Sequence, residues 1–581
     1  MSRRSGVVIL SLLLLVLSPS ALAQLIVEPP RDEKPAPAVE KKAVDLLETI
    51  SEQVASLHSP LNRIRSECVI ADLLWKRDEK RARALFKTAS DDLVNMIAEI
   101  DFGEQDVYPQ LSWLNQQRAE MTNRLAAHDP EAAVAFVRAT HIGFSRDPRT
   151  RWYAEMETNL ELQLAGTIAR QNPARSLEIA RATLSRGVSY GLISLLNQLQ
   201  AKDPKAAQTL YKEMVELLKR TDLERNYEPA NVAWSLLYFQ PPQANEEVYR
   251  DLIGTLVSSA VANTATDQTS ISVAQNIYSQ MPALMPLIEK YSPSRAASLR
   301  QWSQGVERTF DPSTRMYQEL NRISQNGTVD DVLALAPRYS GELQNQVYQQ
   351  AVWKALSSGD ANRARQIAMD FISDPLQQRQ MLAQIENQSI EAAINEEKTA
   401  EVRQILGRVK AIERRVQILL RLAAARAGKG DKKGALELLN EARTATDAAP
   451  AGPGQLMSQL QLAQSYASLD QDQSFAIIQP LIVRTNELIA AAVVLDGFDF
   501  RYFKEGEWIS PGANTLGNLV NNLILTLGLL ARTDFDRARA SADQMERPEL
   551  RLSADIEIAR VTLSGKVNGP PVGGLQYLRI E

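Results

Sequence analysis

The chain has 581 residues, which is too long for one ordinary globular core. Hydrophobic residues make up 44% of the chain and aromatic residues only 6%, and runs rich in valine, isoleucine and threonine are few. This composition favours helix over strand and argues against a large sheet. The formal net charge of −5 argues against general binding of nucleic acid.

The first 23 residues have the pattern of a cleaved secretory signal peptide. Arg3 and Arg4 form a charged start, residues 7–17 form an apolar core, and Ala21 and Ala23 complete an A-x-A cleavage motif. The apolar core is too short to span a bilayer comfortably, so we favour a cleaved signal peptide. The alternative is a membrane anchor that is not cleaved. We therefore expect a periplasmic or secreted bacterial protein with no transmembrane segment after cleavage. Cleavage would remove two arginines and no acidic residue, which leaves a net charge of −7.

Beyond the signal, the sequence predicts a proline-rich linker over 24–40 and then helical blocks. Helical patterning starts near Val39, and we divide the rest of the chain into an N-terminal repeat block over 41–225, degenerate repeats over 226–350, a C-terminal repeat block over 351–564 and a flexible tail over 565–581. A polar stretch with three prolines at 222–245 is where the array could be interrupted. The sequence leaves open whether the array is continuous there.

Residues 419–442 contain the clearest helical hairpin. In its second helix Ala435, Leu438, Leu439 and Ala442 stand at positions i, i+3, i+4 and i+7, which is one face of an α-helix. A similar apolar stripe lies on the first helix of the hairpin, which precedes the turn at Gly430. Because a lone hairpin cannot bury both of its sides, this pattern predicts stacking against further hairpins.

Related phrases recur along the chain. The phrase D-x-x-R-A-R begins at Asp78, Asp360 and Asp534, and we interpret each aspartate as the N-cap of a second helix. In looser copies the caps are followed by proline at the first helical position, where a missing N–H costs nothing; these caps are Asp129, Asn172 and Asp203. At roughly 34–40 residues per unit, the chain could hold about thirteen hairpins.

The unit at 419–442 resembles a tetratricopeptide repeat. Ala435 matches that family's small residue of the second helix, and Leu422-Ala423 matches its Leu-Gly pair. Arg426 stands where the family usually has tyrosine, and the usual closing proline is replaced by Asp447. The resemblance implies a superhelix with a concave groove that binds peptides or proteins, and it implies no catalytic residues.

Residues 496–515, the aromatic insertion, do not fit the helical pattern. They carry five aromatic rings among charges and glycines: Phe498, Phe500, Tyr502, Phe503 and Trp508. The alternation of the first three predicts a short extended strand. Aromatic loops on rigid scaffolds commonly bind partners, so these residues are candidates for a partner site. The alternative is that the rings fill a gap between neighbouring helices.

A second candidate is a basic stretch over 401–433. It has ten basic and three acidic residues on an otherwise acidic chain. If several of these cations line one groove, they could bind an acidic peptide or an anionic polymer; the residues we select are Arg414, Arg415, Arg421 and Arg426. The alternative is a solvated helix face.

The remaining reactive residues are few. Cys68 lies in an apolar run, which predicts a buried thiol, and the three histidines do not form a metal-ligand pattern. Glu505 and Glu507 flank one glycine, a spacing that has almost no specificity for catalysis. We therefore predict no catalytic, metal or cofactor-binding residues.

These patterns predict an all-α fold: an irregular right-handed α-solenoid of antiparallel helical hairpins. The function we expect is a non-catalytic, exported scaffold or adaptor that binds a protein or peptide partner and no nucleic acid. One alternative is an enzyme acting on cell-envelope polymers, which would need a deep acidic cleft with paired carboxylates of raised pKa. Another is a structural spacer with no specific ligand. The partner and the oligomeric state are left open.

Overall fold

The computed structural model describes residues 36–100, 107–142, 151–240, 244–263, 268–307, 316–317, 319–320, 322–324, 327–395, 399–409, 411–498, 500–509 and 514–564. Nearly all of these residues are helical, and the two short strands among them both lie in the aromatic insertion. The predicted all-α fold is therefore confirmed. The predicted signal peptide, the tail 565–581 and the linker up to residue 35 lie outside the described residues.

The chain folds into two compact units. The first combines Met1–Asp92 with Ser389–Glu581, and the second is Leu93–Gln388. The second unit is thus one uninterrupted segment, whereas the first is assembled from two segments that are far apart in the sequence.

The N-terminal segment of the first unit contributes α2 (Pro37–Val54), α3 (Pro60–Leu74) and most of α4 (Glu79–Ala98). Its C-terminal segment contributes the end of α19 (Pro375–Asn395), α20 (Thr399–Arg408), α21 (Ile412–Gly428), α22 (Lys432–Asp447), α23 (Pro453–Tyr466), α24 (Gln471–Leu495), β1 (Phe503–Lys504), β2 (Glu507–Trp508), α25 (Thr515–Ala531), α26 (Phe535–Ala542) and α27 (Pro548–Ser564).

The second unit contains α5 (Val107–His128), α6 (Pro130–Ala139), α7 (Arg151–Ile168), α8 (Pro173–Leu184), α9 (Tyr190–Lys202), α10 (Pro204–Leu218), α11 (Tyr227–Ser235), the 3-10 helix η2 (Leu236–Tyr238), α12 (Glu246–Ala262), α13 (Gln268–Tyr291), α14 (Pro293–Val306), α16 (Val329–Leu333), η4 (Ala336–Arg338), α17 (Glu342–Ser357) and α18 (Ala361–Phe371). Helices that follow one another pack as pairs in both units, among them α7 with α8, α17 with α18, and α21 with α22.

The hairpin predicted at 419–442 is the pair α21–α22. Gly430 adopts a φ of +85° in the turn, a region that favours glycine. The side chain of Asp431 then caps α22 by accepting a hydrogen bond of 2.9 Å from the backbone nitrogen of Gly434. Ala435, Leu439 and the other predicted stripe residues are buried between the helices. Local sequence signals therefore account for the turn, the cap and the packed face.

The aspartates of the D-x-x-R-A-R phrase are N-caps, as predicted. In each copy the aspartate accepts a hydrogen bond from the backbone nitrogen of the first arginine, at 3.0, 2.8 and 3.0 Å for Asp78, Asp360 and Asp534. The alanine between the arginines is fully buried in all three copies: Ala82, Ala364 and Ala538. Asp129, Asn172 and Asp203 cap α6, α8 and α10 in the same way.

The first arginine of the phrase has a further role that the sequence did not reveal. Its side chain reaches the second residue of an earlier helix, so that one hairpin is tied to another. These ion pairs join Arg363 to Asp330 at 3.0 Å and Arg537 to Asp472 at 2.6 Å, and Arg175 of a looser copy pairs with Glu131 at 3.1 Å. Arg81 differs, because it contacts the backbone oxygen of Glu48 and the carboxylate of Glu52.

The hydrophobic core of the second unit is continuous through the proline-containing stretch. One cluster of buried side chains extends from Leu162 to Leu299 and includes Leu223, Trp234 and Phe239. The hydroxyl of Tyr249 also donates a hydrogen bond of 2.7 Å to the backbone oxygen of Leu237. The described residues of this stretch, 222–240 and 244–245, therefore contribute to one core cluster that also includes residues before and after it.

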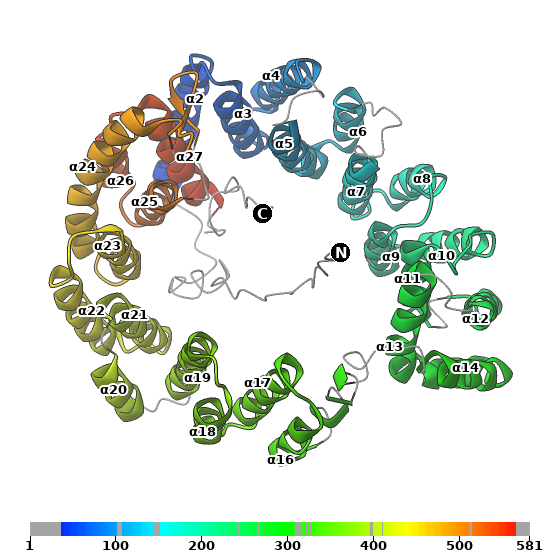
Figure 1. The fold of residues 1–581 in the computed structure, drawn as a ribbon. Helices are drawn as coiled ribbons and strands as arrows, with labels where there is room; N and C mark the ends of the chain where they lie inside the picture. Colours follow the sequence, from blue (N-terminus) through cyan, green and yellow to red (C-terminus); the bar gives the residue numbers. More distant parts are fainter. Residues whose placement is uncertain are drawn as a thin grey trace, which may run out of the picture. The chain divides into compact units, whose positions relative to one another are not determined.

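In the first unit the last described helix packs against the first. Helix α27 lies between α25 and α2, and Figure 1 shows blue α2 beside red α27. Most of α27 is buried, including the acidic residues Glu549, Asp555 and Glu557. Leu47 and Ile50 of α2 are buried at this contact region, and Lys42 pairs with Asp536 of α26 at 2.5 Å. The two ends of the chain thus supply one continuous stack of helices within this unit.

Candidate functional site

The aromatic insertion contains a β-hairpin. Strands β1 and β2 pair antiparallel with Phe503 opposite Trp508, and the turn between them is Glu505-Gly506. Both turn residues have positive φ values, +53° and +78°, as the tight hairpin turns of type I′ require. The strand predicted over 498–502 was wrong, because the pairing begins at Phe503 and Phe500 makes only an isolated bridge to Asp496. We call residues 503–508 the clasp hairpin.

Glu507 of the clasp hairpin binds the start of α3. Its carboxylate accepts hydrogen bonds from the backbone nitrogens of His58 at 2.6 Å and Ser59 at 3.2 Å, and from the side-chain amide of Asn62 at 3.0 Å. A carboxylate at this position is favoured by the partial positive charge of a helix N-terminus. The contact joins residues more than 440 positions apart, and it is buried.

Trp508 completes the same junction. Its indole is only 2% exposed, its backbone nitrogen donates to the carboxylate of Glu549 at 2.9 Å, and its backbone oxygen accepts from Asn62 at 3.1 Å. Arg547 donates a hydrogen bond of 2.6 Å to the backbone oxygen of Gly506. The clasp hairpin therefore connects α3 of the N-terminal segment with α27 of the C-terminal segment.

The other half of the insertion faces solvent. Phe498 is 86% exposed and Val494, at the end of α24, is 85% exposed. Val493, Leu495 and Phe500 are about half exposed, and we call these five exposed apolar residues between positions 493 and 500 the apolar tip. Contiguous exposed apolar side chains are characteristic of interaction surfaces.

A series of aromatic contacts joins the apolar tip to the clasp hairpin. The ring of Phe500 lies 6.2 Å from that of Tyr502, and Tyr502 stacks on Trp508 at 5.7 Å. Trp508 in turn meets Phe503 edge to face at 5.6 Å. Asp496 also accepts hydrogen bonds from the backbone nitrogens of Tyr502 and Phe503. The exposed part of the loop is therefore held by the buried part.

The five predicted aromatic candidates thus divide into two groups. Phe503 and Trp508 are buried within the chain, Tyr502 is half-buried, and Phe498 and Phe500 are exposed. The buried rings of Phe503 and Trp508 agree with the alternative in which the rings fill a gap between helices. Partner binding stays a prediction, and it concerns the exposed rings of Phe498 and Phe500.

The four arginines selected from the basic stretch lie on α21. Arg421 forms an ion pair with Glu391, and Arg426 pairs with Asp431 at 3.1 Å. Arg414 is half-buried and Arg415 is exposed. Two of the four cations are therefore already neutralised within the chain, and a cationic groove stays a prediction.

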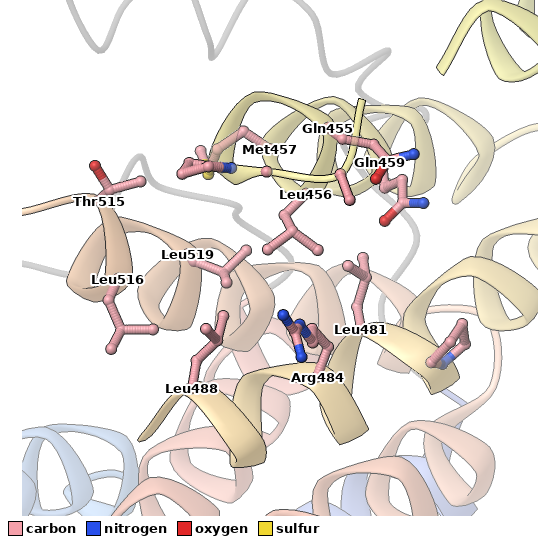
Figure 2. Close-up of a pocket in the computed structure, with 14 residues that line it drawn as sticks. Gln455, Leu456, Met457, Gln459, Leu481, Arg484, Leu488, Thr515, Leu516 and Leu519 are labelled. Carbon is pink, nitrogen blue, oxygen red and sulfur yellow. The ribbon is translucent and has the colours of Figure 1, made fainter. Parts of the chain in front are cut away.

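A pocket of about 560 Å³ opens between α23, α24 and α25 (Figure 2). Its lining is mostly apolar and includes Leu456, Leu481, Leu488, Leu516 and Leu519. Arg484 of α24 is the one ionisable side chain among its described lining residues. The sequence pattern did not indicate this pocket, since three helices have to meet to form it. We call it the α24 pocket.

Two buried carboxyl groups have strongly raised pKa values. Burial, with a contribution from Asp92, raises the pKa of Glu67 to about 7, and burial, with a contribution from Asp543, raises that of Asp555 to about 7. Both are embedded in helix packing, and neither lines the α24 pocket.

Within the described part of the chain, no group of three or more histidine, cysteine, aspartate or glutamate side chains is arranged to hold a metal ion. Cys68 is buried, as predicted. Helix α24 is long and apolar enough to cross a membrane by length and composition. Phe475, Ile478, Leu481 and other residues of α24 are buried, and α24 packs against α23 and α25.

Comparison with known proteins adds little to this description. No protein-family model and no curated protein matches the sequence. Among solved structures, one similar chain is described as a circular tandem repeat protein with novel repeat topology and enhanced subunit contact surfaces; it has 14% identity and a TM-score of 0.14, and the match covers 90% of this chain and 98% of that one. Another comes from the APC/C hetero-tetramer Cut9–Hcn1, with 11% identity, a TM-score of 0.15 and coverage of 86% and 98%. At such low scores, the fold assignment rests on the helix pairing within the chain itself.

Proposed function

We propose that the protein is an exported helical-repeat scaffold that binds a partner protein through the apolar tip. The observation that carries this proposal is the exposure of Phe498 and Val494, each more than four-fifths accessible, beside three further apolar side chains. A stack of paired helices is a rigid support, and rigid supports with projecting loops are common in protein recognition.

The surroundings of the apolar tip favour a protein as the partner. The exposed residues beside it carry both signs of charge: Asp496, Arg501, Lys504 and Glu505. An apolar centre with a mixed polar rim is the usual anatomy of a protein–protein interface. A surface for nucleic acid or an anionic membrane would instead need a predominance of cations.

The clasp hairpin supports the proposal because it limits the motion of the loop. Phe500 is connected through Tyr502 to the buried Trp508, whose backbone is held by α3 and α27. A loop that is already ordered loses less conformational entropy when a partner binds. The anchor residues would therefore be presented in a nearly fixed geometry.

Site-specific cross-linking tests the proposed surface. A photoreactive amino acid at position 498 should capture a partner from the cell-envelope fraction, whereas one at position 376 should not, because Leu376 is exposed but lies on α19 of the second unit. The captured protein, once purified, should bind the wild type and fail to bind a Val494→Ser/Phe500→Ser variant of unchanged melting temperature. Capture of the same proteins from both positions, or wild-type affinity in the double variant, would contradict the proposal.

Export is a separate part of the proposal and has its own test. The charged start, apolar core and A-L-A motif of residues 1–23 support it. The full-length protein should appear in the periplasmic fraction with a new N-terminus at Gln24. Replacing Ala21 and Ala23 with bulky residues should leave an uncleaved, membrane-bound form, and a cytoplasmic wild type would contradict export.

A further inference from the structure

The α24 pocket has the size and lining of a small-molecule site. Its volume of about 560 Å³ falls within the range of roughly 300–1,000 Å³ that such sites occupy. Six large aliphatic side chains from three helices surround it: Leu456, Met457, Leu481, Leu488, Leu516 and Leu519. Four of these, Leu456, Met457, Leu488 and Leu516, are only partly buried, so the apolar interior is accessible to a ligand from solvent.

One cation stands beside this apolar lining. Figure 2 shows Arg484 between Leu481 and Leu488 on the α24 side of the pocket. Its ion pair is with Glu487, three residues along the same helix, at 2.6 Å, and both side chains are 56% exposed. Such an exposed i,i+3 pair is weak, so the guanidinium can turn to an anionic ligand at small cost.

Polar groups on the opposite wall are few. The amide of Gln455 donates to the backbone oxygens of Thr446 and Ala449, so it is already engaged. The amide of Gln459 also lines the pocket. Since one cation, two amides and the hydroxyl of Thr515 stand among many aliphatic groups, the pocket suits a ligand with a long apolar part and a single anionic end.

We propose that the α24 pocket binds a single-chain aliphatic carboxylate, with its chain among the leucines and its carboxylate on Arg484. The apolar chain would replace the solvent that contacts the leucine side chains, which is favourable in proportion to the area buried. The carboxylate would gain a charge-assisted and geometrically matched partner in the guanidinium. This site is independent of the apolar tip, so either proposal can fail without the other.

Titration of the mature chain with dodecanoate, kept below its micelle concentration, tests the site, and dodecanol serves as the uncharged ligand of the same chain. Arg484→Gln should weaken dodecanoate binding by about three- to fivefold and leave dodecanol binding nearly unchanged. Leu488→Trp should fill the pocket and reduce the binding of both ligands at least tenfold. Arg501→Gln and Val483→Trp are the matched controls, because both residues are exposed and neither lines the pocket.

The result expected is saturable binding of dodecanoate that is sensitive to both pocket variants and to neither control. Equal weakening by Leu488→Trp and Val483→Trp would overturn the proposal, as would the absence of binding by a folded wild type. Binding that appears only after removal of residues 565–581 would also overturn it, since the chain's own C-terminal tail would then be the occupant.

Discussion

A carboxylate oxygen of Glu507 lies 2.6 Å from the backbone nitrogen of His58, although 449 positions separate the two residues in the sequence. Ser59 occupies the N-cap position of α3, but its side chain makes no capping hydrogen bond and its hydroxyl is buried without a partner. Glu507 therefore serves the helix start from a distant part of the chain. The capping role that the local sequence would assign to the side chain of Ser59 is performed by Glu507 of the clasp hairpin.

Replacing Glu507 with glutamine should loosen this junction. The amide keeps the shape of the side chain but loses the negative charge, and it can no longer accept with both of its terminal atoms. We expect a loss of about 1–3 kcal/mol in the free energy of unfolding of the first unit. Hydrogen exchange should accelerate at the start of α3, where the clasp hairpin is attached.

Glu505→Gln is the matched control for this prediction, because Glu505 is an exposed neighbour in the same hairpin. It should leave both measurements unchanged within error. If Glu507→Gln and Glu505→Gln behaved alike, the contact between Glu507 and α3 would contribute nothing measurable.

Arg537, the first arginine of the last D-x-x-R-A-R phrase, should contribute more by covering an aromatic ring than by its ion pair. The guanidinium of Arg537 lies 4.1 Å from the ring centre of the buried Phe475, while its partner Asp472 is 79% exposed. Arg537→Ala should therefore cost about 1–2 kcal/mol in denaturant unfolding, and Asp472→Ala only about 0.5 kcal/mol or less. Equal costs for the two variants would show that the ion pair carries the effect.

Much of the fold could be predicted because its signals are local. The caps at Asp129, Asp203 and Asp534 depend on residues within one helical turn, and the α21–α22 hairpin depends on one apolar stripe and one glycine turn. Each of these features lies within a window of about fifteen residues, so it can be recognised in a single sequence.

The parts that could not be predicted depend on contacts between distant segments. The pairing of α2 with α27, the partners of Glu507 and the α24 pocket each need elements that no local pattern brings together. The strand was placed five residues too early because its position is set by burial of Phe503 and Trp508 and not by aromatic alternation. Charge counts along a sequence likewise do not reveal that Arg421 and Arg426 are already paired with Glu391 and Asp431.

A buried ion pair in the second unit should be more sensitive than any of these surface contacts. Arg118 and Glu157 are almost fully buried, and the guanidinium donates to both carboxylate oxygens and to the hydroxyl of Thr140. Glu157→Ala would leave the guanidinium buried without its counter-charge, which should cost about 3–5 kcal/mol in unfolding free energy. Glu161→Ala on the same helix removes a partly exposed pair with Arg186 and should cost about 1 kcal/mol or less. Similar melting temperatures for the two variants would contradict this account.

Two neighbouring glycines in the α21–α22 turn should respond in opposite ways to alanine. Gly430 has a φ of +85° with open space around it, so Gly430→Ala should cost about 1 kcal/mol through backbone strain alone. Gly428 ends α21 without a positive φ and also has open space, so Gly428→Ala should be neutral or slightly stabilising. Thermal unfolding of the two variants is the measurement. A loss of stability in Gly428→Ala equal to that in Gly430→Ala would indicate that side-chain volume matters at this turn.

The buried carboxyl of Asp555 should make the stability of the first unit depend on pH. Burial raises its pKa from 3.8 to about 7, so between these values the folded chain binds more protons at this site than the unfolded chain does. This site therefore contributes a loss of stability as the pH rises from about 4 to about 7. Asp555→Asn removes that loss, and its stability relative to the wild type should increase by about 1–3 kcal/mol between about pH 4 and pH 8 in denaturant unfolding. The exposed Glu546→Gln should show no such trend, and a constant difference between Asp555→Asn and the wild type across this range would rule out ionisation of Asp555 as the cause.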